Sequence, residues 1–228
     1  MIVVYAMTKN LYPYFRPTLR SLLEHNNPEK VYILAETDTL LYDLPDVCEV
    51  INVSGYKKLF REDGPNFRSQ FTWMAMMRAM YAEILPVDRV IQLDIDTIIC
   101  DSLEPIWEID LTGKWFAACP EYLSRYRPFG DTYYNIGVCV FNLQQIREDG
   151  VLPVIVSLLN TAPLFCVEQD AWNYFGLKAD RIAQLPVRYN ETFCCGTTDN
   201  PAVVHYAGYP DWTNNRTMPR VEYLDRYR

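Results

Sequence analysis

A run of apolar residues over positions 89–100 (RVIQLDIDTIIC) is interrupted by two carboxylates, Asp94 and Asp96. Its content of Val, Ile and Leu is typical of a buried strand. Because side chains alternate along a strand, we expect both carboxylates to project to the same side. Two carboxylates so close together repel each other unless a cation or several donors hold them. A hard divalent ion such as Mg²⁺ or Mn²⁺, with phosphate oxygens as further ligands, suits the pair. The alternative is a chance Asp-x-Asp in a solvated turn.

Length and charge limit the classes of protein that fit. The 228 residues, half of them apolar, suffice for one sizeable α/β domain or at most two small ones. No linker divides the chain, so we expect one domain at residues 1–212 with a C-terminal tail at 213–228, packed on it or trailing from it. A net charge of −8 argues against a nucleic-acid partner, since no basic stripe is present to neutralise phosphates. No stretch has the roughly 18 apolar residues of a membrane-spanning helix. Residues 1–6 are expected to form a strand rather than a signal peptide.

The seven cysteines are odd in number and lack C-x-x-C spacing. This pattern predicts no disulfide framework and a reducing compartment, so we expect a cytoplasmic protein. The adjacent Cys194 and Cys195 suggest either a redox or soft-metal site or simple packing, and we favour packing because no second Cys pair or paired His lies nearby.

Strands and helices alternate along the first half of the chain. Strands are expected at residues 2–7, 31–35 and 47–53, with a helix following Pro13 between the first two. This βαβ order predicts a parallel sheet with right-handed crossovers. Later strands are expected at 114–119, 137–142, 182–185 and 202–206, and helical segments at 103–109, 143–149, 152–159 and from 167. Residues 54–67 and 124–131 are expected to be loops, and the tail is not assigned.

A helix is predicted over residues 69–85, with a Met-rich and aromatic inner face that we interpret as core. Arg78 lies on this helix among apolar neighbours and therefore needs a partner. The alternative is a surface arginine whose guanidinium snorkels to solvent.

Five spaced segments together resemble the family 8 glycosyltransferases, the group that contains glycogenin and bacterial lipopolysaccharide galactosyltransferases. The resemblance extends roughly from Val3 to Trp212. The segments are YAMTKN at 5–10, the Arg78 helix leading into VIQLDID at 90–96, YNIGVCVFN at 134–142, EQD at 168–170 followed by Asn173, and HYAG at 205–208. The resemblance implies a GT-A fold, which is a single nucleotide-sugar-binding α/β domain around a mostly parallel sheet.

The resemblance also implies a metal site. Asp94, Asp96 and His205 would coordinate Mn²⁺ or Mg²⁺, and the ion would grip the diphosphate of a UDP-sugar. The imidazole favours Mn²⁺ over Mg²⁺. The alternative for a lone histidine at a strand end is a structural hydrogen-bonding residue.

The donor-binding residues follow from the same resemblance. Ala6, Thr8 and Asn10 match positions that hold uridine at the carboxyl end of the first strand, where ligands of open α/β sheets bind. Leu11 occupies the place of the family's stacking tyrosine, and Tyr12 would substitute. The remaining donor-binding residues are Arg78, Asp94, Ile95, Glu121, Glu168 and Gly208, and the residues assigned to catalysis are Arg78, Asn135 and Gln169.

One departure from the family pattern concerns the leaving group. The family often has a lysine a few residues after the glycine of the last segment, where it contacts the diphosphate. This chain has Tyr209-Pro210-Asp211-Trp212 there. Charge stabilisation would then rest on the metal and Arg78, unless Arg216 or Arg220 folds back.

The resemblance implies retention of configuration, with departure of UDP stabilised by a Lewis-acidic metal. Covalent catalysis by Gln169 is disfavoured because an amide is a poor nucleophile. The partners would be a UDP-hexose and an unidentified acceptor, which could be a glycan, a lipid-linked sugar, a protein or a polyol. A second copy of the chain is a further candidate partner, in a homodimer.

Three other classes of protein share part of this pattern. A haloacid-dehalogenase-type phosphatase would place its Asp-x-Asp after the first strand, whereas some ninety residues precede it here. A nucleotidyltransferase would have a Gly-rich phosphate loop after the first strand, and Met7-Thr8-Lys9-Asn10 has no glycine. A non-catalytic nucleotide-sugar-binding protein is compatible with the missing lysine.

Overall fold

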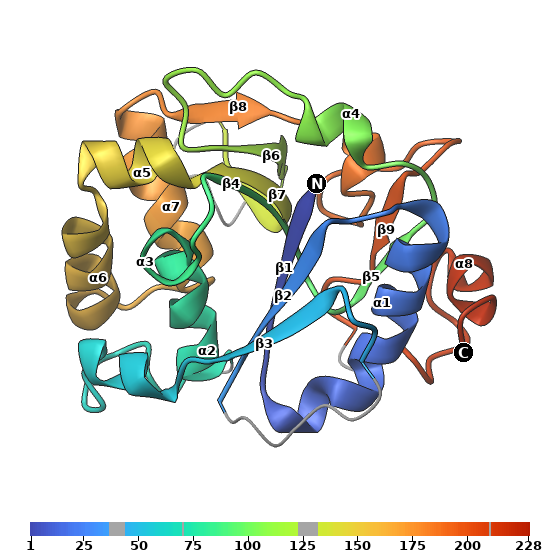
Figure 1. Ribbon diagram of the computed structural model, residues 1–228, viewed down its shortest axis with the longest axis horizontal. Coiled ribbons are helices and arrows are strands. Elements are labelled where there is room, and N and C mark those ends of the chain that lie inside the picture. The colour runs from blue at the N-terminus through green and yellow to red at the C-terminus, as the bar shows by residue number, and fades with distance from the viewer. Residues whose placement is uncertain (37–43, 70, 123–131, 210) are drawn as a thin grey trace.

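A seven-stranded sheet with the order β3-β2-β1-β4-β7-β6-β8 forms the centre of the molecule (Figure 1). The computed structural model of the chain describes residues 1–36, 44–69, 71–122, 132–209 and 211–228. The loop predicted at 124–131 lies outside the described residues. The strands of this sheet are β1 (Ile2–Met7), β2 (Lys30–Ala35), β3 (Cys48–Asn52), β4 (Arg89–Leu93), β6 (Phe116–Pro120), β7 (Tyr134–Asn142) and β8 (Ile182–Gln184).

The central sheet is mostly parallel, as predicted. β1 pairs in parallel with β2 and β4, β2 with β3, and β6 with β8. β7 is the exception, because it runs antiparallel to both β4 and β6. This reversal has a consequence for the site: the beginning of β7 lies beside the carboxyl end of β4.

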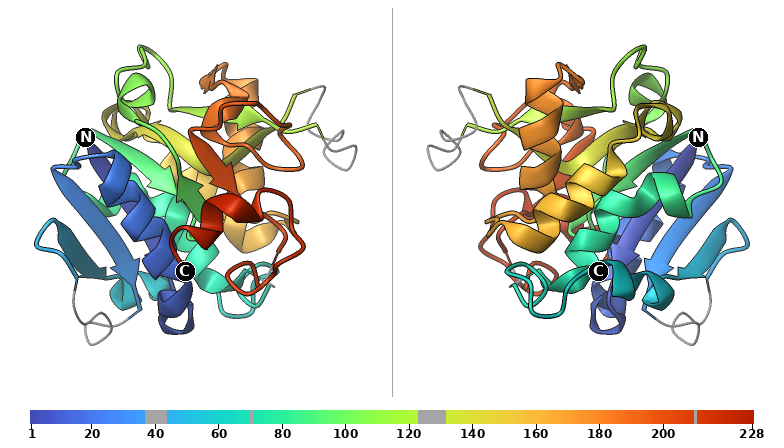
Figure 2. Two further views of the ribbon diagram at one scale, coloured as in Figure 1. Left: turned by 90° about the vertical axis from the view of Figure 1, so that its right-hand side faces the viewer. Right: turned by 90° about the vertical axis from the view of Figure 1, so that its left-hand side faces the viewer.

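Helices cover both faces of the sheet (Figure 2). They are α1 (Tyr12–His25), α2 (Thr72–Met77), α3 (Tyr81–Ile84), α4 (Glu104–Trp107), α5 (Leu143–Asp149), α6 (Leu152–Thr161), α7 (Glu168–Lys178) and α8 (Val221–Asp225). Alternation along β1 serves two cores: Tyr5 packs in one cluster with Phe15 of α1, and Val4 packs in the other with Trp172 of α7. A strand that is buried on both faces needs apolar residues at successive positions.

A second, two-stranded sheet pairs β5 (Thr97–Ile99) antiparallel with β9 (Val203–His205). Its apolar face packs against the end of the chain, where Trp212, Met218, Leu224 and Tyr227 are buried together with Ile98 and Val204. The tail that the sequence left unassigned therefore carries α8 and contributes to this cluster.

Three local predictions were wrong. The segment predicted as one helix over 69–85 consists of α2, a 3₁₀ turn (Arg78–Met80) and α3. The strand predicted to carry Asp94 and Asp96 ends at Leu93, so that both carboxylates lie in the turn between β4 and β5. The segment predicted as a loop from residue 54 begins with a 3₁₀ helix (Ser54–Leu59). Further 3₁₀ turns occur at Lys9–Leu11 and Val187–Tyr189.

No helix within the described residues combines the length and the apolar character needed to cross a bilayer.

Candidate active site

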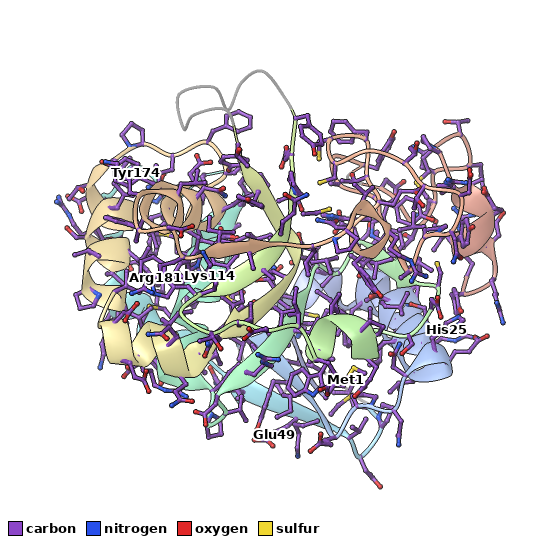
Figure 3. All side chains as sticks on the ribbon, turned by 90° about the horizontal axis from the view of Figure 1, so that it is seen from above. Met1, His25, Glu49, Lys114, Tyr174 and Arg181 are labelled. Atoms are coloured by element: carbon purple, nitrogen blue, oxygen red, sulfur yellow. The ribbon has the colours of Figure 1, made fainter. Side chains whose placement is uncertain are left out.

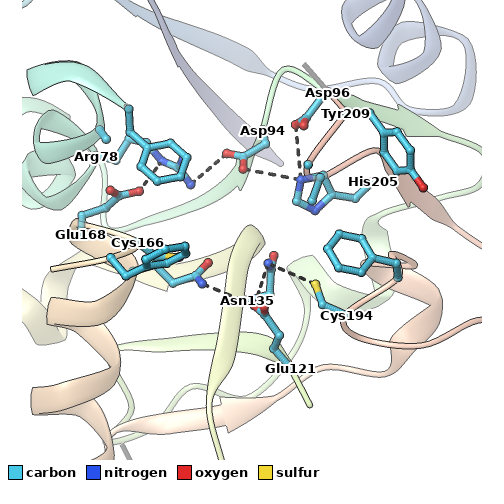
Figure 4. A pocket seen from close by; sticks show the side chains of 17 residues that line it. Arg78, Asp94, Asp96, Glu121, Asn135, Cys166, Glu168, Cys194, His205 and Tyr209 are labelled. Carbon is cyan, nitrogen blue, oxygen red and sulfur yellow. Dashed lines mark hydrogen bonds and ion pairs between the residues drawn. The ribbon is translucent and has the colours of Figure 1, made fainter. Parts of the chain in front are cut away.

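Asp94, Asp96 and His205 meet at the carboxyl end of β4 (Figure 4). One ligand atom from each lies within 4.8 Å of the others. His205 Nε2 is 3.3 Å from Asp96 Oδ1 and 3.7 Å from Asp94 Oδ2. The pairing of Thr97 with His205 across β5 and β9 brings the histidine to the acidic turn, and the Tyr206 amide donates to the Asp96 carbonyl at 2.8 Å. The predicted convergence is therefore present, although sheet pairing produces it rather than strand alternation.

Gly137 in β7 provides the room for this cluster. A Cβ at this position would lie 2.2 Å from His205 Cε1 and 2.9 Å from Asp94 Oδ2. The Gly137 carbonyl also accepts the Asp94 amide at 2.7 Å. A side chain larger than hydrogen would displace the imidazole, so glycine is required here for steric reasons.

The three groups perturb one another's protonation. Burial alone would lower the pKa of His205, but the Asp96 carboxylate, and after it Asp94, outweighs burial and raises the pKa to about 9. Burial would raise the pKa of Asp96, and the neighbouring imidazolium reverses this so that the pKa falls. The pKa of Asp94 is raised, because burial there exceeds the opposing effects of Arg78 and His205. Without a metal, the cluster is held together by a proton on the imidazole.

Arg78 lies between two acids. Its Nη2 is 2.8 Å from Asp94 Oδ1, and its Nε is 3.1 Å from Glu168 Oε1, without the alignment of a hydrogen bond. Only 18% of the side chain is exposed, so the alternative of a snorkelling arginine is wrong. Burial raises the pKa of Glu168 to about 7, although Arg78 opposes this. The partners that the buried guanidinium needs are thus Asp94 in the acidic turn and Glu168 in the first turn of α7, neither of which was predicted for this role.

Amide and carboxylate side chains line the other half of the site. Asn135 Nδ2 donates to Glu121 Oε2 at 3.1 Å, and Gln169 Nε2 donates to the same oxygen at 3.4 Å. Gln169 Oε1 accepts the Ile136 amide at 3.0 Å. Asn135, Glu121 and Gln169 are all buried, which leaves them rigid and with few alternative partners.

Two adjoining cavities, of about 550 and 390 Å³, share Arg78, Asp94 and Asp96 in their walls. Every predicted site residue except Tyr12 lines one of them. The larger is lined by Glu121, Asn135, Glu168, Gln169, His205 and Gly208, and the smaller by Ala6, Thr8, Asn10 and Ile95. Tyr12 begins α1 and packs on Phe15, whereas Leu11 and Tyr14 line the smaller cavity. The Tyr12 substitution is therefore not supported by its position.

Some residues of the site were missed by sequence reasoning. Phe71 and Tyr209 line both cavities, and Phe165, Phe193 and Cys194 line the larger one. Isolated aromatic residues in loops carry no periodic signal. Cys194 and Cys195 pack with Cys119, which agrees with the packing interpretation of the adjacent pair. All seven cysteines are free thiols.

The two candidate replacements for the missing lysine are engaged elsewhere. Arg216 pairs with Asp225 at 2.5 Å, and Arg220 Nε binds Glu191 Oε1 at 2.5 Å. Neither arginine is among the described residues that line the cavities. Within those lining residues, Arg78 is the one arginine or lysine.

The donor set of the cluster fits a divalent cation. Two carboxylates and one imidazole are suitable ligands for Mn²⁺, and the carboxylates also suit Mg²⁺. All three residues line the larger cavity, and Asp94 and Asp96 also line the smaller one, so a bound ion would have positions left for ligand oxygens.

The mixed α/β sheet, with its acidic cluster at the carboxyl edge, has the GT-A fold. The chain belongs to glycosyl transferase family 8, whose sequence model matches residues 2–215.

Relatives and solved structures agree with this assignment. A putative glycosyltransferase of Haemophilus influenzae is 23% identical over 216 residues, covering 84% of this chain and 63% of that protein. The glycosyltransferase GlyF of Streptococcus pneumoniae is 26% identical over 246 residues, covering 98% of this chain and 59% of that protein. This chain thus spans about three fifths of the length of these curated relatives.

Two crystal structures of LgtC share the fold. An active-site mutant has a TM-score of 0.78 at 19% identity. The galactosyltransferase LgtC in complex with donor and acceptor sugar analogs has a TM-score of 0.77 at 20% identity. In both cases the match covers 100% of this chain and 95% of that chain. The sequence model thus shows the family, and these two structures show the fold.

Proposed function

We propose that the protein transfers a hexose from a UDP-sugar to an acceptor hydroxyl, with retention of configuration, when Mn²⁺ or alternatively Mg²⁺ is bound. The observation that carries this proposal is the cluster of Asp94, Asp96 and His205, which lines the larger cavity and whose two carboxylates also lie in the wall of the smaller one. A diphosphate at this wall would have the nucleoside on one side and the sugar on the other. The larger cavity, with its amides and carboxylates, suits the hydroxyls of a sugar.

The charges of the site support a metal requirement. The larger cavity is lined by four acids, Asp94, Asp96, Glu121 and Glu168, and Arg78 is already paired with two of them. A diphosphate would meet net negative charge there. A bound divalent ion supplies the compensating charge and Lewis acidity that stabilise the departing diphosphate.

The protein's own residues bind and orient the donor. Arg78 would keep Asp94 and Glu168 in place, and Asn135 and Glu121 would hold the sugar through its hydroxyls. Both ends of the Gln169 amide are engaged, the oxygen by Ile136 and the nitrogen by Glu121 and Tyr133. This supports a positioning role for Gln169 rather than nucleophilic attack. The acceptor hydroxyl would approach the anomeric carbon of the sugar from the face on which UDP departs, and its proton would pass to the departing phosphate.

Thermal unfolding with UDP-glucose or UDP-galactose, with and without Mn²⁺, tests the proposal. A ligand present at 100 times its dissociation constant stabilises the native state by about 2.7 kcal/mol. We expect Asp96→Ala to abolish the Mn²⁺-dependent rise in melting temperature and the Mn²⁺-dependent release of UDP. Asp63→Ala, at an exposed ion pair with Arg61, is the control and should behave like the wild type. Undiminished UDP release by Asp96→Ala would contradict the assigned metal role.

A second candidate function is nucleotide-sugar binding without transfer. It is favoured by the pairing of Arg216 and Arg220 away from the cavities, which leaves the missing lysine unreplaced. Mn²⁺-dependent binding of UDP-sugar without UDP release, across a panel of glycan, lipid-linked, protein and polyol acceptors, would select this alternative. A cytoplasmic location and a homodimer stay predictions.

A further inference from the structure

We propose that Asn190 is a positioning residue that fixes which ring nitrogen of His205 faces the two carboxylates and links this histidine to the sugar side of the larger cavity. Asn190 is completely buried and follows the 3₁₀ turn Val187–Tyr189. No motif marks it in the sequence. The assignment of a sugar side rests on the proposed function, whereas the effect on His205 does not.

Two groups beside Asn135 each have a single hydrogen-bonding role. The Gly137 amide can only donate, and it points at Asn135 Oδ1 at 2.9 Å. A Glu121 carboxylate can only accept, and its Oε2 lies 3.1 Å from Asn135 Nδ2. Both contacts require the same orientation of the Asn135 amide. Its oxygen and nitrogen, which diffraction seldom distinguishes, are therefore determined by chemistry.

The orientation of the Asn135 amide determines that of the Asn190 amide. Asn135 Oδ1 can only accept, and its neighbour at 2.8 Å is therefore the donating Nδ2 of Asn190. This leaves Asn190 Oδ1 facing His205 Nδ1, also at 2.8 Å. An amide oxygen has no proton to give, so His205 Nδ1 must carry the hydrogen. The opposite nitrogen, Nε2, is then the one that faces Asp94 and Asp96 and can present a lone pair to a cation.

The backbone keeps Asn190 beside the histidine independently of these side chains. The amide of the next residue, Glu191, donates to the Val203 carbonyl at 2.9 Å, and the His205 amide donates to the Glu191 carbonyl at 2.8 Å. Loss of the contact between the Asn190 side chain and His205 should therefore change the orientation and protonation of the imidazole more than the path of the backbone. With 5% of His205 exposed, water has little access to replace the lost acceptor.

The same chain of hydrogen bonds reaches the residues that would bind the sugar. From His205 it runs through Asn190 and Asn135 to Glu121, which also accepts from Gln169. Partners of this kind around a ligating histidine typically change metal affinity 10–100-fold when removed. In this molecule the partner of the histidine is also the partner of Asn135, so one amide serves both halves of the site.

Two variants separate these roles. Asn190→Leu removes both bonds. Asn190→Asp keeps an acceptor for His205 Nδ1–H but cannot donate to Asn135 Oδ1. We expect Asn190→Leu to weaken Mn²⁺ binding 10–100-fold, measured as free Mn²⁺ by electron paramagnetic resonance. Asn190→Asp should retain Mn²⁺ affinity far better, yet weaken UDP-hexose binding at saturating Mn²⁺. Asn200→Asp, at an exposed position, is the matched control and should match the wild type in both measurements.

A spectroscopic readout tests the histidine directly, because the chain has two histidines. His25 lies at the periphery (Figure 3) and contacts Tyr227 through Nε2. In metal-free protein labelled with ¹⁵N-histidine, at a pH where the imidazole is neutral, we expect a slowly exchanging proton on His205 Nδ1. In Asn190→Leu this proton should exchange rapidly with solvent, and in Asn190→Asp it should stay protected.

Several outcomes would overturn the inference. The inference fails if the neutral imidazole of wild-type His205 carries its proton on Nε2, and this result does not depend on whether Asn190→Leu folds. It also fails if Asn190→Leu folds and binds Mn²⁺ with wild-type affinity. If the wild type binds Mn²⁺ but no UDP-sugar, the proposed function fails, while the Mn²⁺ and proton measurements still decide the role of Asn190.

Discussion

Gly137 shows how one residue without functional groups can control the geometry of a candidate metal site. We expect Gly137→Ala to lower the free energy of unfolding by about 1–3 kcal/mol and to abolish Mn²⁺ binding. The reason is steric, since the new Cβ would lie 2.2 Å from His205 Cε1 and the imidazole would have to move. Calorimetric titration with Mn²⁺ and a denaturant melt measure the two effects. Gly55→Ala is the control, because a Cβ there meets nothing within 4 Å. Wild-type Mn²⁺ affinity in Gly137→Ala would show that the cluster tolerates displacement.

Arg78 offers a second test, of the electrostatics of the site. Replacing it by Met leaves Glu168, whose side chain is 4% exposed, without a cationic partner. Breaking a buried ion pair by removing one partner destabilises by about 3–5 kcal/mol. We expect Arg78→Met to lose stability of that order at pH 8 and to lose less at pH 5, where the Glu168 carboxyl is protonated. Urea unfolding at the two pH values measures this. Arg61→Met, at an exposed pair, should show no measurable change. Equal losses at both pH values would contradict the assignment.

Residue types and their order identified most of the site, but packing decided the rest. The acidic pair was predictable from its two-residue spacing, whereas His205 entered the candidate site through the resemblance to family 8 glycosyltransferases. The choice between Leu11, Tyr12 and Tyr14 at the smaller cavity was not, because it depends on how the 3₁₀ turn Lys9–Leu11 directs α1. Asn190 was not predictable either, because its role exists only through contacts 55 and 15 residues away.

The start of α7 is the element that presents Glu168 and Gln169 to the site. Val167, just before it, has a φ of +46°, an uncommon conformation for a β-branched residue, and Asp170 Oδ2 accepts the amides of Phe165 and Cys166 at 2.8 and 3.0 Å. These contacts hold the turn that precedes the helix. Asp170 is thus a structural residue of the helix N-terminus rather than a ligand-binding one.

Asp170→Ala tests this assignment. The change leaves two backbone amides without their acceptor and releases the Tyr133 hydroxyl, which donates to Asp170. We expect a loss of about 2–3 kcal/mol in the free energy of unfolding. UDP-hexose affinity should fall because Gln169 Nε2 contacts Tyr133, whereas Mn²⁺ affinity should stay at the wild-type value. Chemical denaturation and two titrations measure these quantities. A parallel loss of Mn²⁺ binding would mean that α7 also supports the metal cluster.

Local sequence patterns predicted the strands and their burial. They did not predict where a helix is interrupted or which strand runs antiparallel. β1 matches its predicted range of residues 2–7, because an apolar run next to a polar turn leaves little choice. The predicted helix over 69–85 is interrupted by the 3₁₀ turn at Arg78, the residue whose ion pairs reach Asp94 and Glu168. Neither the interruption nor the antiparallel direction of β7 has a local signal, since both depend on distant partners.

At the scale of the whole molecule, we expect protonation and metal binding to compete for one imidazole. In the metal-free protein the pKa of His205 rises from 6.5 to about 9, because Asp96 and Asp94 outweigh burial. A raised pKa means that the folded protein binds more protons than the unfolded chain between these values. The resulting stabilisation, on the order of 3 kcal/mol, is fully present below pH 6.5 and is lost as the pH rises to about 9.

The buried carboxyl of Glu168 acts in the same direction at lower pH. Its pKa rises from 4.5 to about 7, so its ionisation in the folded state destabilises the protein between these values. We therefore expect the melting temperature in EDTA to decline steadily from pH 5 to pH 9. His205→Gln should remove the part of the decline above pH 6.5 and leave the part below it.

Added Mn²⁺ should reverse the trend above pH 6.5. A ligating imidazole must lose its Nε2 proton, so metal affinity rises as the pH approaches 9. The gap between melting temperatures in Mn²⁺ and in EDTA should widen from pH 6.5 to pH 9, and a calorimetric titration in buffers of different ionisation enthalpy should show proton release on binding. Asp96→Ala should show no gap at any pH. A gap that stays constant across this range would mean that His205 is neutral before the ion arrives, and that the two carboxylates do not hold a proton on the ring.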